Sequence, residues 1–270
     1  MINIIPMAGE GTRFSKDGYK LPKALIPVSG EPMIVQVIRT LPQAEKWVFV
    51  VRKEHVEQYN IDEVIKKEIP DAVIIPLDAT TEGQASTCML ALEDVPDDEE
   101  VFIAACDNSF LFNETKFNAL RERDDVDAVI WTFSEDKLLT DNPEAWGWLR
   151  VEEDNETITD VSVKIPVSDD PYTDHAVVAT FYFKQAGEFK EAYNTMYAED
   201  HRINGEFYVD SMPTFYKKLG KKSVIFDVDL YVGWGKPSDL YDYQLREYTH
   251  SIGKETDENW NTFFEKLLAK

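Results

Sequence analysis

Two glycines near the amino terminus stand where a chain could bind phosphate. Residues 7–14 read MAGEGTRF and follow the short apolar run 2–6. Gly9 and Gly11 are separated by one residue, which lets the backbone turn tightly and come close to a ligand. A loop of exposed N–H groups at the end of a buried strand attracts anions. The segment therefore predicts a phosphate-binding loop.

The distribution of charge indicates the same kind of ligand. Residues 1–24 hold four cationic side chains against two acidic ones, a net charge of +2. The whole chain has 28 Lys and Arg against 51 Asp and Glu, a net charge of −23. A positive segment in such an acidic chain suits an anionic ligand. A surface loop that carries lysines without any ligand is the alternative.

Several other phosphate and metal motifs are missing. The dinucleotide-binding fingerprint needs a third glycine at position 14, which is Phe14. A Walker loop needs Gly-Lys followed by Ser or Thr, and the chain has no such triplet. The four histidines lack zinc-ligand spacing. The sequence therefore disfavours a hydride-transfer enzyme, a P-loop NTPase and a zinc enzyme.

A carboxylate follows another apolar run. Asp107 comes after residues 101–105, which read VFIAA. If both apolar runs are parallel strands, Asp107 and the glycine loop lie at the same edge of the sheet, where ligands bind in such folds. An aspartate that only turns or caps the chain is the alternative.

The elements that must position these residues alternate between strand and helix in the first half of the chain. Apolar runs of strand length lie at 2–6, 47–52, 72–76, 101–105 and 127–133. Apolar residues at helical spacing lie at 33–41, 61–67, 83–93 and 115–123. This alternation, with strands apolar on both sides, predicts a parallel sheet covered by helices on both faces.

Beyond about residue 134 the pattern becomes richer in strands. We expect strands at 146–151, 158–163, 176–183 and 223–228, and helices at 187–198, 209–219, 237–247 and 257–268. No linker rich in Pro, Gly or Ser divides the chain. The prediction is an α/β fold with a Rossmann-like, mixed and mostly parallel sheet flanked by helices, and a smaller β-rich elaboration. One domain would span 1–245, with halves 1–134 and 135–245, before a helical tail at 246–270.

Composition limits the class of protein further. Hydrophobic residues make up 43% and aromatic residues 12%, which is enough for a substantial core. A net charge of −23 repels nucleic acids and anionic membranes, so we expect neither as a partner. Cys88 and Cys106 are expected to be reduced core residues. The chain opens without a charged and apolar leader and has no apolar run near ~20 residues, so we expect cytoplasmic residence.

A two-part motif connects the chain with a known family. Residues 9–13 read GEGTR and residues 22–28 read PKALIPV. Together they resemble the G-x-G-[ST]-R loop and the following P-K-x-L-x-P-V of the sugar-phosphate nucleotidyltransferases, also called nucleoside-diphospho-sugar pyrophosphorylases. The intervening RF, GY and PK pairs are most similar to those of capsule-type members. The resemblance implies the nucleotide-diphospho-sugar transferase fold.

The resemblance also implies roles for residues in the first half. Arg13 and Lys23 would be the catalytic cations that hold phosphate oxygens, and Asp107 would bind a catalytic Mg²⁺. Nucleotide contacts would come from the glycine loop, from the segment 81–85 (TEGQA) and from the residue after Asp107. These nucleotide-binding residues are Ala8, Gly9, Gly11, Thr12, Glu82, Gly83 and Asn108.

Three residues of the second half would contact the acceptor molecule. Lys164 lies in a segment, VKIP, that resembles the family's E-K-x-P and would hold the acceptor's phosphate. Asn204 and Glu206 lie in NGEFYV, which resembles the segment that lines the acceptor pocket. Val163 replaces the family's Glu, so one acceptor contact is missing.

The metal-binding pattern departs from that of many relatives. These relatives carry a second metal-binding Asp where this chain has Gly233, a glycine that capsule-type members share. Asp227, Asp229, water or substrate phosphates would then complete the coordination of Mg²⁺, which commonly binds through one or two carboxylates plus phosphate.

The implied reaction is nucleotidyl transfer between an NTP and a phosphorylated small molecule. An NMP group would pass to a sugar 1-phosphate, giving an NDP-sugar and pyrophosphate for capsule or cell-surface polysaccharide synthesis. A cytidylyltransferase that acts on a non-sugar phosphorylated metabolite is one alternative, and a non-catalytic nucleotide-binding paralogue is another. Assembly into a homo-oligomer also stays open.

Overall fold

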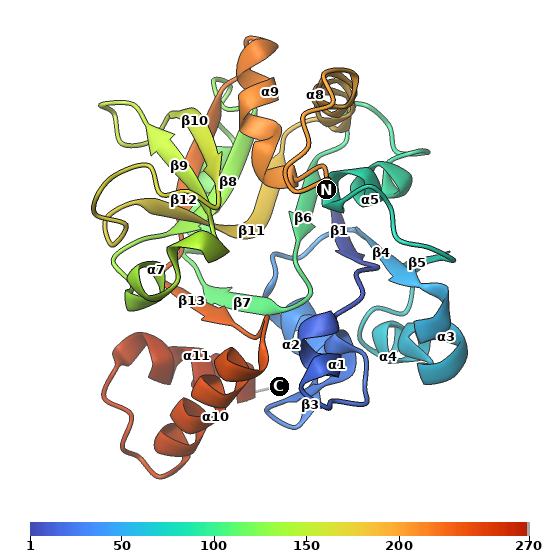
Figure 1. Ribbon diagram of the computed structural model, residues 1–270, viewed down its shortest axis with the longest axis vertical. Coiled ribbons are helices and arrows are strands. Elements are labelled where there is room, and N and C mark those ends of the chain that lie inside the picture. The colour runs from blue at the N-terminus through green and yellow to red at the C-terminus, as the bar shows by residue number, and fades with distance from the viewer. Residues whose placement is uncertain (269–270) are drawn as a thin grey trace.

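The computed structural model describes residues 1–268, in which one mixed nine-stranded sheet runs through the molecule with helices on both faces (Figure 1). The strands lie close to the predicted apolar runs. They are β1 (Ile2–Met7), β4 (Lys46–Arg52), β5 (Val73–Leu77), β6 (Val101–Ala104), β8 (Ala128–Phe133), β9 (Gly147–Val151), β10 (Ile158–Val163), β11 (His175–Phe183) and β12 (Ser223–Asp227).

The strand order explains where the parallel and antiparallel parts lie. The path runs β10-β9-β11-β6-β1-β4-β5. Off this path, β8 pairs with β11, and β12 pairs with β8. The strands β6, β1, β4 and β5 are parallel neighbours, as the β-α alternation predicts. The long strand β11 is antiparallel to β6, β8 and β9. It therefore separates β8 from the parallel group, although β8 runs in the same direction.

Two apolar cores lie on opposite faces of the sheet. Successive side chains of a strand point to opposite sides, so Ile5 and Met7 join one core, whereas Ile2 and Ile4 join the other. The first core includes residues of α2 (Met33–Thr40), α4 (Ile61–Glu68), α6 (Glu114–Arg121), α10 (Pro237–Ser251) and α11 (Glu258–Leu268). The second includes residues of α5 (Gln84–Ala91), α8 (Ala186–Ala198) and α9 (Met212–Lys218).

A few short elements were not expected from the sequence. A two-stranded ribbon joins β7 (Asn108–Leu111) to β13 (Leu230–Gly233), and a second joins β2 (Pro27–Val28) to β3 (Glu31–Pro32). The short helices are α1 (Thr12–Lys16), α3 (Lys53–Tyr59) and α7 (Lys137–Asp141), with 3-10 turns η1 (Lys23–Leu25) and η2 (Pro143–Ala145). The expected helix at 209–219 forms as a 3-10 turn, η3 (Val209–Ser211), followed directly by α9. The β7–β13 ribbon matters for the site because β7 begins directly after Asp107.

The carboxyl-terminal helices belong to the first core. α10 runs to Ser251, past the expected end at 247, so the expected boundary between 245 and 246 falls inside a helix. Phe263, Phe264 and Leu267 of α11 are buried with Tyr243 of α10. The end of the expected tail, residues 269–270, lies outside the described residues. Among residues 1–268, no helix is both long and apolar enough to cross a membrane.

Candidate active site

The glycine loop follows β1 and presents backbone N–H groups that have no hydrogen-bond partner among the described residues. Gly11 adopts φ 61° and ψ 28°, a left-handed conformation that favours glycine, and it starts α1. Within residues 1–268, nothing accepts a hydrogen bond from the amides of residues 9, 10 or 11. Ala8 is buried beneath the loop, whereas Gly9 and Thr12 are exposed. The loop can therefore donate several hydrogen bonds to an anion.

Lys23 and Asp107 meet beside this loop. Lys23 Nζ lies 2.6 Å from Asp107 Oδ2, and each side chain is about one quarter exposed (24% and 23%). A Cβ atom at Gly11 would lie 3.4 Å from Lys23 Cβ, so the loop and η1 are in contact. Burial opposes the charge on Lys23, but the neighbouring Asp107 carboxylate outweighs it and holds the pKa of Lys23 above its ordinary value.

Positive charge near the loop is left unpaired. Arg13, Lys16 and Lys20 form no ion pair with any residue in the described part of the chain. The charge of Arg13 acts on Lys23 and also on Tyr208, whose pKa is raised mainly by burial. Arg13 is therefore close enough to act electrostatically on both Lys23 and Tyr208, and among the described residues no acid pairs with its guanidinium.

The neighbours of Asp107 are fixed by hydrogen bonds. Asn108 is buried, and its side-chain amide donates to the carbonyl of Val178 at 2.8 Å, so this amide is engaged inside the protein. The backbone carbonyl of Asp107 accepts from the N–H of Trp234 at 2.8 Å. Burial raises the pKa of the preceding Cys106 thiol to about 11, so it is a neutral core residue rather than a nucleophile. These contacts fix the backbone around Asp107, and none of them involves an oxygen of its carboxylate.

A close contact joins the segment 81–85 to the predicted acceptor segment. The N–H of Phe207 donates to the carbonyl of Glu82 at 2.8 Å, and the N–H of Ala85 donates to the carbonyl of Phe207 at 3.0 Å. Gly83 has φ 132°, and a Cβ there would lie 2.5 Å from the backbone nitrogen of Phe207. The Glu82 carboxylate also pairs with Arg202 at 2.7 Å. Only glycine at position 83 permits this approach.

The predicted acceptor residues fall into two groups. Asn204 and Glu206 are exposed on a left-handed turn at 204–205, next to the contact just described. Lys164 lies elsewhere, with φ 68° and its N–H donating to the carbonyl of Trp146 at 2.8 Å. The structure thus brings Asn204 and Glu206 toward the segment 81–85, and Lys164 toward the start of β9.

One carboxylate that sequence reasoning did not select stands near Lys164. Burial raises the pKa of Asp210 to about 6, and the charge of Lys164 acts in the opposite direction. A Cβ at Gly147 would lie 2.5 Å from Asp210 Oδ2, so this carboxylate needs the glycine opposite it. Asp210 directly follows the NGEFYV segment, so reading that segment one residue further would have found it.

Tyr231 occupies the space beside Gly233, the position at which the resemblance implies a second acid in many relatives. β13 sets Gly233 opposite Asn108, next to Asp107. A Cβ at Gly233 would lie 2.9 Å from the hydroxyl of Tyr231, whose ring stacks on Phe133 at 4.6 Å between centroids. A carboxylate at 233 would require this ring to move. Tyr231 lies only two residues before Gly233, but the stacking on Phe133 that holds its ring there joins distant segments and leaves no local pattern in the sequence.

The two other acids expected near the metal are engaged elsewhere. Asp227 accepts a hydrogen bond from Thr132 at 2.6 Å and pairs with His175 at 3.1 Å. Asp229 precedes the end of the ribbon that is distant from Asp107, since Leu230 pairs with Leu111. Neither contributes to the neighbourhood of Asp107.

With Asp107 left as the one expected metal-binding acid beside the loop among the described residues, the site fits a cation that arrives bound to the nucleotide. Among residues 1–268, no group of three or more His, Cys, Asp or Glu could hold a metal by itself. Asp107 offers one partly exposed carboxylate, and Mg²⁺ can bind through a single carboxylate when phosphate oxygens and water complete its octahedron. The residues present fit a shared magnesium site and not a permanent one.

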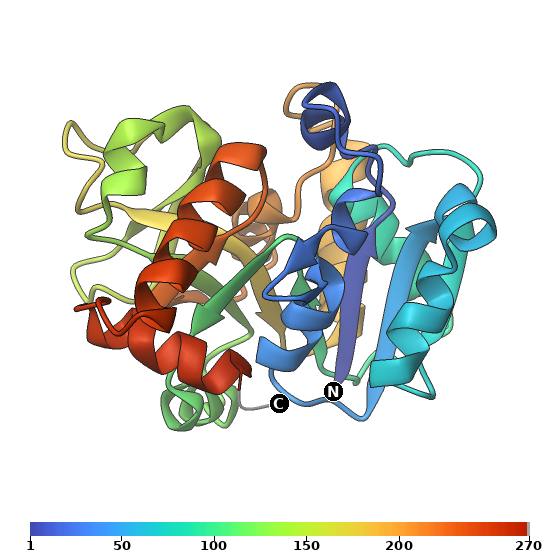
Figure 2. The ribbon, with the colours of Figure 1, turned by 90° about the horizontal axis from the view of Figure 1, so that it is seen from below.

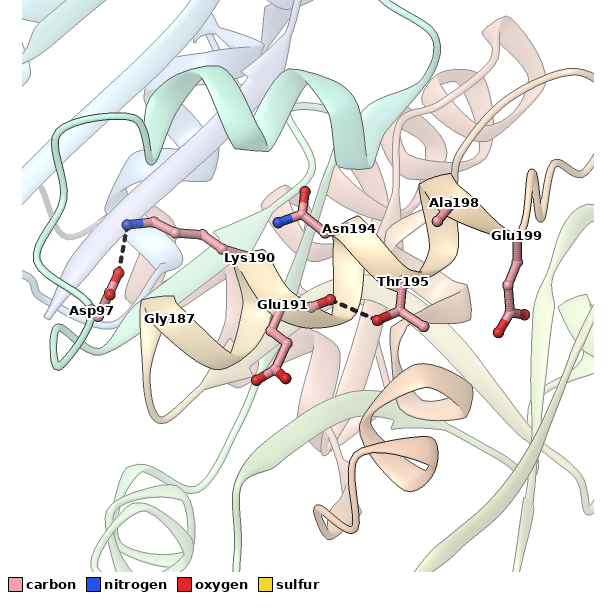
Figure 3. Close-up of a pocket in the computed structure, with 8 residues that line it drawn as sticks. All are labelled: Asp97, Gly187, Lys190, Glu191, Asn194, Thr195, Ala198 and Glu199. Atoms are coloured by element: carbon pink, nitrogen blue, oxygen red, sulfur yellow. Dashed lines mark hydrogen bonds and ion pairs between the residues drawn. The ribbon is translucent and has the colours of Figure 1, made fainter.

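Two hollows on the surface lie away from these residues. One of about 590 Å³ lies along α8, where Lys190 bonds to Asp97 at 2.8 Å and the helix supplies most of the lining (Figure 3). The other lies between α10 and the end of α11. Neither includes the glycine loop, Lys23 or Asp107, so they do not define the candidate active site.

Comparison with protein families gives one match. The sequence profile of the MobA-like NTP transferase domain matches residues 3–247. A comparison with curated proteins found no match.

Solved structures with the same architecture cover nearly the whole chain. A nucleoside-diphosphate-sugar pyrophosphorylase from Vibrio cholerae RC9 has a TM-score of 0.72 at 20% identity, over 90% of this chain and 99% of that one. The inositol-1-phosphate CTP transferase from T. maritima has a TM-score of 0.69 at 16% identity, over 90% and 94%. A UDP-glucose pyrophosphorylase solved with UDP-glucose has a TM-score of 0.66 at 16% identity, over 92% and 98%. This likeness confirms the predicted fold.

Proposed function

Because the chain belongs to the MobA-like NTP transferase family and is thus a nucleotidyltransferase, we propose that it transfers an NMP group from an NTP to a sugar 1-phosphate. The products would be an NDP-sugar and pyrophosphate. The acceptor's phosphate oxygen attacks the α-phosphorus in line, and the bond from this phosphorus to the bridging oxygen of pyrophosphate breaks.

One observation carries the proposal. Three backbone N–H groups that have no partner within residues 1–268 lie beside the 2.6 Å pair of Lys23 and Asp107. Amides and a lysine suit the oxygens of a triphosphate, and a carboxylate suits the cation that accompanies it. The phosphate-binding groups and the carboxylate lie together at the carboxyl edge of the parallel strands, where such folds bind ligands.

The cations of the site would do most of the chemical work. Arg13 and Lys23 would neutralise the triphosphate and the departing pyrophosphate, which lowers the barrier by stabilising charge that develops in the transition state. A phosphate monoester is already largely ionised at pH 7, so the attacking oxygen needs no general base. The protein therefore acts by positioning and by charge stabilisation.

Asp107 would hold Mg²⁺ together with phosphate oxygens, and the ion when bound supplies positive charge at the reacting phosphates. Lys23 would then exchange part of its contact with Asp107 for a contact with the nucleotide. The 2.6 Å pair supports this exchange, since both side chains are partly exposed and neither is locked in the core.

The second half of the chain would hold the acceptor. Lys164 would bind its phosphate and offset the repulsion between two anionic substrates. Asn204 and Glu206 would line the pocket from the exposed turn. We add Asp210 to this set, because a carboxylate near Lys164 can accept hydrogen bonds from acceptor hydroxyls.

We also propose a biological setting, on the strength of the resemblance to capsule-type members. An NDP-sugar made in the cytoplasm would serve capsule or cell-surface polysaccharide synthesis. The net charge of −23 supports small-molecule partners rather than nucleic acids or anionic membranes.

A second candidate keeps the reaction and changes the acceptor. The T. maritima protein of similar fold is an inositol-1-phosphate CTP transferase, whose acceptor is a phosphorylated cyclitol. Gly233 and Val163 remove two acids that many sugar-specific relatives carry, which leaves room for a non-sugar phosphometabolite and a CDP-linked product. A non-catalytic paralogue would bind the nucleotide without turnover.

A substrate matrix separates these candidates. Each common NTP is combined with a panel of sugar 1-phosphates and of non-sugar phosphometabolites in the presence of Mg²⁺, and pyrophosphate release is measured. Turnover confined to sugar 1-phosphates supports the first proposal, and turnover with CTP and a non-sugar acceptor supports the second. Tight NTP binding with no pyrophosphate from any pair would contradict both.

A further inference from the structure

The hydroxyl of Tyr231 lies against the same turn of the chain as the Asp107 carboxylate. A Cβ atom at Gly233 would lie 2.9 Å from this hydroxyl, and one at Gly235 would lie 3.2 Å from Asp107 Oδ2. The two glycines therefore leave the space that the hydroxyl and the carboxylate occupy. Tyr231 is half-buried, and within residues 1–268 its hydroxyl forms no hydrogen bond. It is thus an unused polar group next to the expected metal ligand.

Aromatic packing fixes the ring that carries this hydroxyl. The ring of Tyr231 stacks on Phe133 with an interplanar angle of 16°, and it meets Trp146 edge to face at 5.4 Å between centroids. Phe133 is the last residue of β8, and Trp146 directly precedes β9, so two strands of the sheet hold the neighbours of the ring. A ring held in this way loses little freedom when a ligand binds. The hydroxyl is therefore pre-organised.

The same ring contacts the predicted acceptor side of the site. The carbonyl of Trp146 accepts a hydrogen bond from the N–H of Lys164 at 2.8 Å, and Lys164 is the residue expected to bind the acceptor's phosphate. Figure 2 shows α7, in yellow-green, at the same edge of the molecule as the dark-blue loop that follows β1. Tyr231 thus lies near Asp107 and packs on the residue whose carbonyl holds the backbone of Lys164.

The hydroxyl keeps its proton. Burial, together with the negative charges of Asp107, Asp136 and Asp239, raises the pKa of Tyr231 well above its ordinary value. A protonated phenol can donate one hydrogen bond. Phosphate oxygens are strong acceptors, because a hydrogen bond to an ionised group is shorter and stronger than one between neutral groups. A phosphate is therefore the ligand that suits this donor best in the proposed reaction.

We propose that the Tyr231 hydroxyl donates a hydrogen bond to the phosphate of the acceptor and holds it for attack on the α-phosphorus. This inference rests on the proposed function and adds a catalytic residue to it, since the hydroxyl would touch the reacting phosphate. The acceptor is favoured over the nucleotide because the ring packs on Trp146, which belongs to the predicted acceptor side. No proton moves in this step, because the phosphate is already largely ionised.

Tyr231→Phe tests the proposal, because it removes the hydroxyl and keeps the ring on Phe133 and Trp146. The assay uses the NTP and the acceptor that the substrate matrix selects. The kcat/KM for the acceptor should fall about 10–100-fold, the usual loss for one hydrogen bond to a charged group. The acceptor KM should rise, whereas the dissociation constant of the NTP, measured by calorimetry with Mg²⁺, should stay within about twofold of the parent value because the nucleotide does not contact the hydroxyl.

Tyr216→Phe is the matched control. Tyr216 lies in the second core, and its buried hydroxyl also has no hydrogen-bond partner among the described residues. The same atom is then removed on the other face of the sheet, so this variant should keep the parent kcat/KM. Thermal unfolding provides a second readout. Tyr231→Phe should keep the parent Tm, because its hydroxyl bonds to nothing within residues 1–268, whereas a structural hydroxyl would lower the Tm when removed.

Three results would count against the proposal. A Tyr231→Phe enzyme with the parent kcat/KM for the acceptor would overturn it and leave nucleotidyl transfer intact. A loss confined to NTP affinity or to the Mg²⁺ dependence of the rate would also overturn it, since the hydroxyl would then serve the nucleotide. A parent chain that turns over no pair in the matrix would contradict the proposed function itself, and the role of Tyr231 would fall with it.

Discussion

Lys23 and Asp107 have opposite tasks in the proposed reaction, and the structure holds them in contact. One would turn to phosphate and the other to a cation, although each now neutralises its neighbour at 2.6 Å. Separating them costs more than breaking a surface ion pair would, because both side chains are about three quarters buried. Binding of a charged nucleotide with its cation can supply that energy, so the pair can open without unfolding the site.

Replacing either loop cation should slow the reaction. Arg13→Ala and Lys23→Ala are each expected to lower the rate roughly 10²–10³-fold, equivalent to about 3–4 kcal/mol of transition-state stabilisation. Pyrophosphate release measures this. Lys16→Ala is the control, since Lys16 lies on the same short helix without an assigned role. If both variants fold and react at the parent rate, the loop does not bind the triphosphate.

Asp107→Asn should remove the dependence of the rate on Mg²⁺. An amide keeps the shape of the carboxylate but binds the cation much less well, since hard cations prefer charged oxygen ligands. A titration of the rate against Mg²⁺ is the measurement, with Asp229→Asn as the control at the distant end of the ribbon. An unchanged titration curve for Asp107→Asn would place the metal elsewhere.

Asp210 should make stability depend on pH. Burial raises its pKa in the folded chain from 3.8 to about 6, so its contribution to stability is fully present below pH 3.8 and is lost as pH rises through about 6. Asp210→Asn should therefore stabilise the protein by about 2–3 kcal/mol at pH 8 and by nothing near pH 3.5. Urea unfolding of both proteins at several pH values measures the difference. A constant difference across that range would contradict the assignment.

At the scale of elements, the contact between the segments 81–85 and 203–207 ties two predicted subsites together. Two backbone hydrogen bonds join them through Phe207, and the guanidinium of Arg202 lies 4.3 Å above the Phe207 ring while pairing with Glu82. A movement of the segment 203–207, on the predicted acceptor side, would therefore be passed to the segment 81–85, on the predicted nucleotide side, through these backbone hydrogen bonds.

Gly83→Ala should disrupt this contact. The new methyl group would lie 2.5 Å from the Phe207 nitrogen at φ 132°, so the two segments must move apart. We expect a loss of about 1–3 kcal/mol in stability together with a raised KM for both substrates. Thermal unfolding and steady-state kinetics are the measurements. Gly205→Ala is the control, because it also has positive φ but open space around it, and its kinetic effect should be smaller.

At the scale of the whole molecule, the carboxyl-terminal helices complete one face of the core. α11 adds Phe263, Phe264 and Leu267 to the cluster that also contains residues of β1 and α2. This face of the core is therefore covered by a helix that lies far along the sequence from β1 and α2. The opposite side of α10 remains exposed.

Phe264→Ala should destabilise the whole protein and not only the last helix. Removing this buried ring leaves a cavity beside Tyr243, and such losses cost about 3–5 kcal/mol. Urea unfolding should show one transition at a lower midpoint. Glu265→Ala, at an exposed neighbouring position, should change stability by less than about 0.5 kcal/mol. A separate early transition for Phe264→Ala would show that α11 unfolds independently.

Much of the fold could be predicted because strands and helices leave local patterns. The runs at 2–6, 47–52 and 101–105 became β1, β4 and β6 within a residue or so. The ribbon of β7 and β13 could not be predicted, since its strands are short and lie more than a hundred residues apart. The fold and the family are confirmed, whereas the roles of individual site residues stay predictions.

The sequence by itself determined the parallel half of the sheet, the glycine loop after its first strand and the class of enzyme, because each depends on neighbouring residues and their spacing. Only the tertiary structure decided that Lys23 meets Asp107, that Gly83 meets Phe207 and that Tyr231 fills the space beside Gly233. The first two contacts join segments that lie far apart in the chain, and Tyr231 is held beside Gly233 by stacking on the distant Phe133. The spacing of neighbouring residues does not determine such long-range contacts, because they result from packing the whole chain around its two cores.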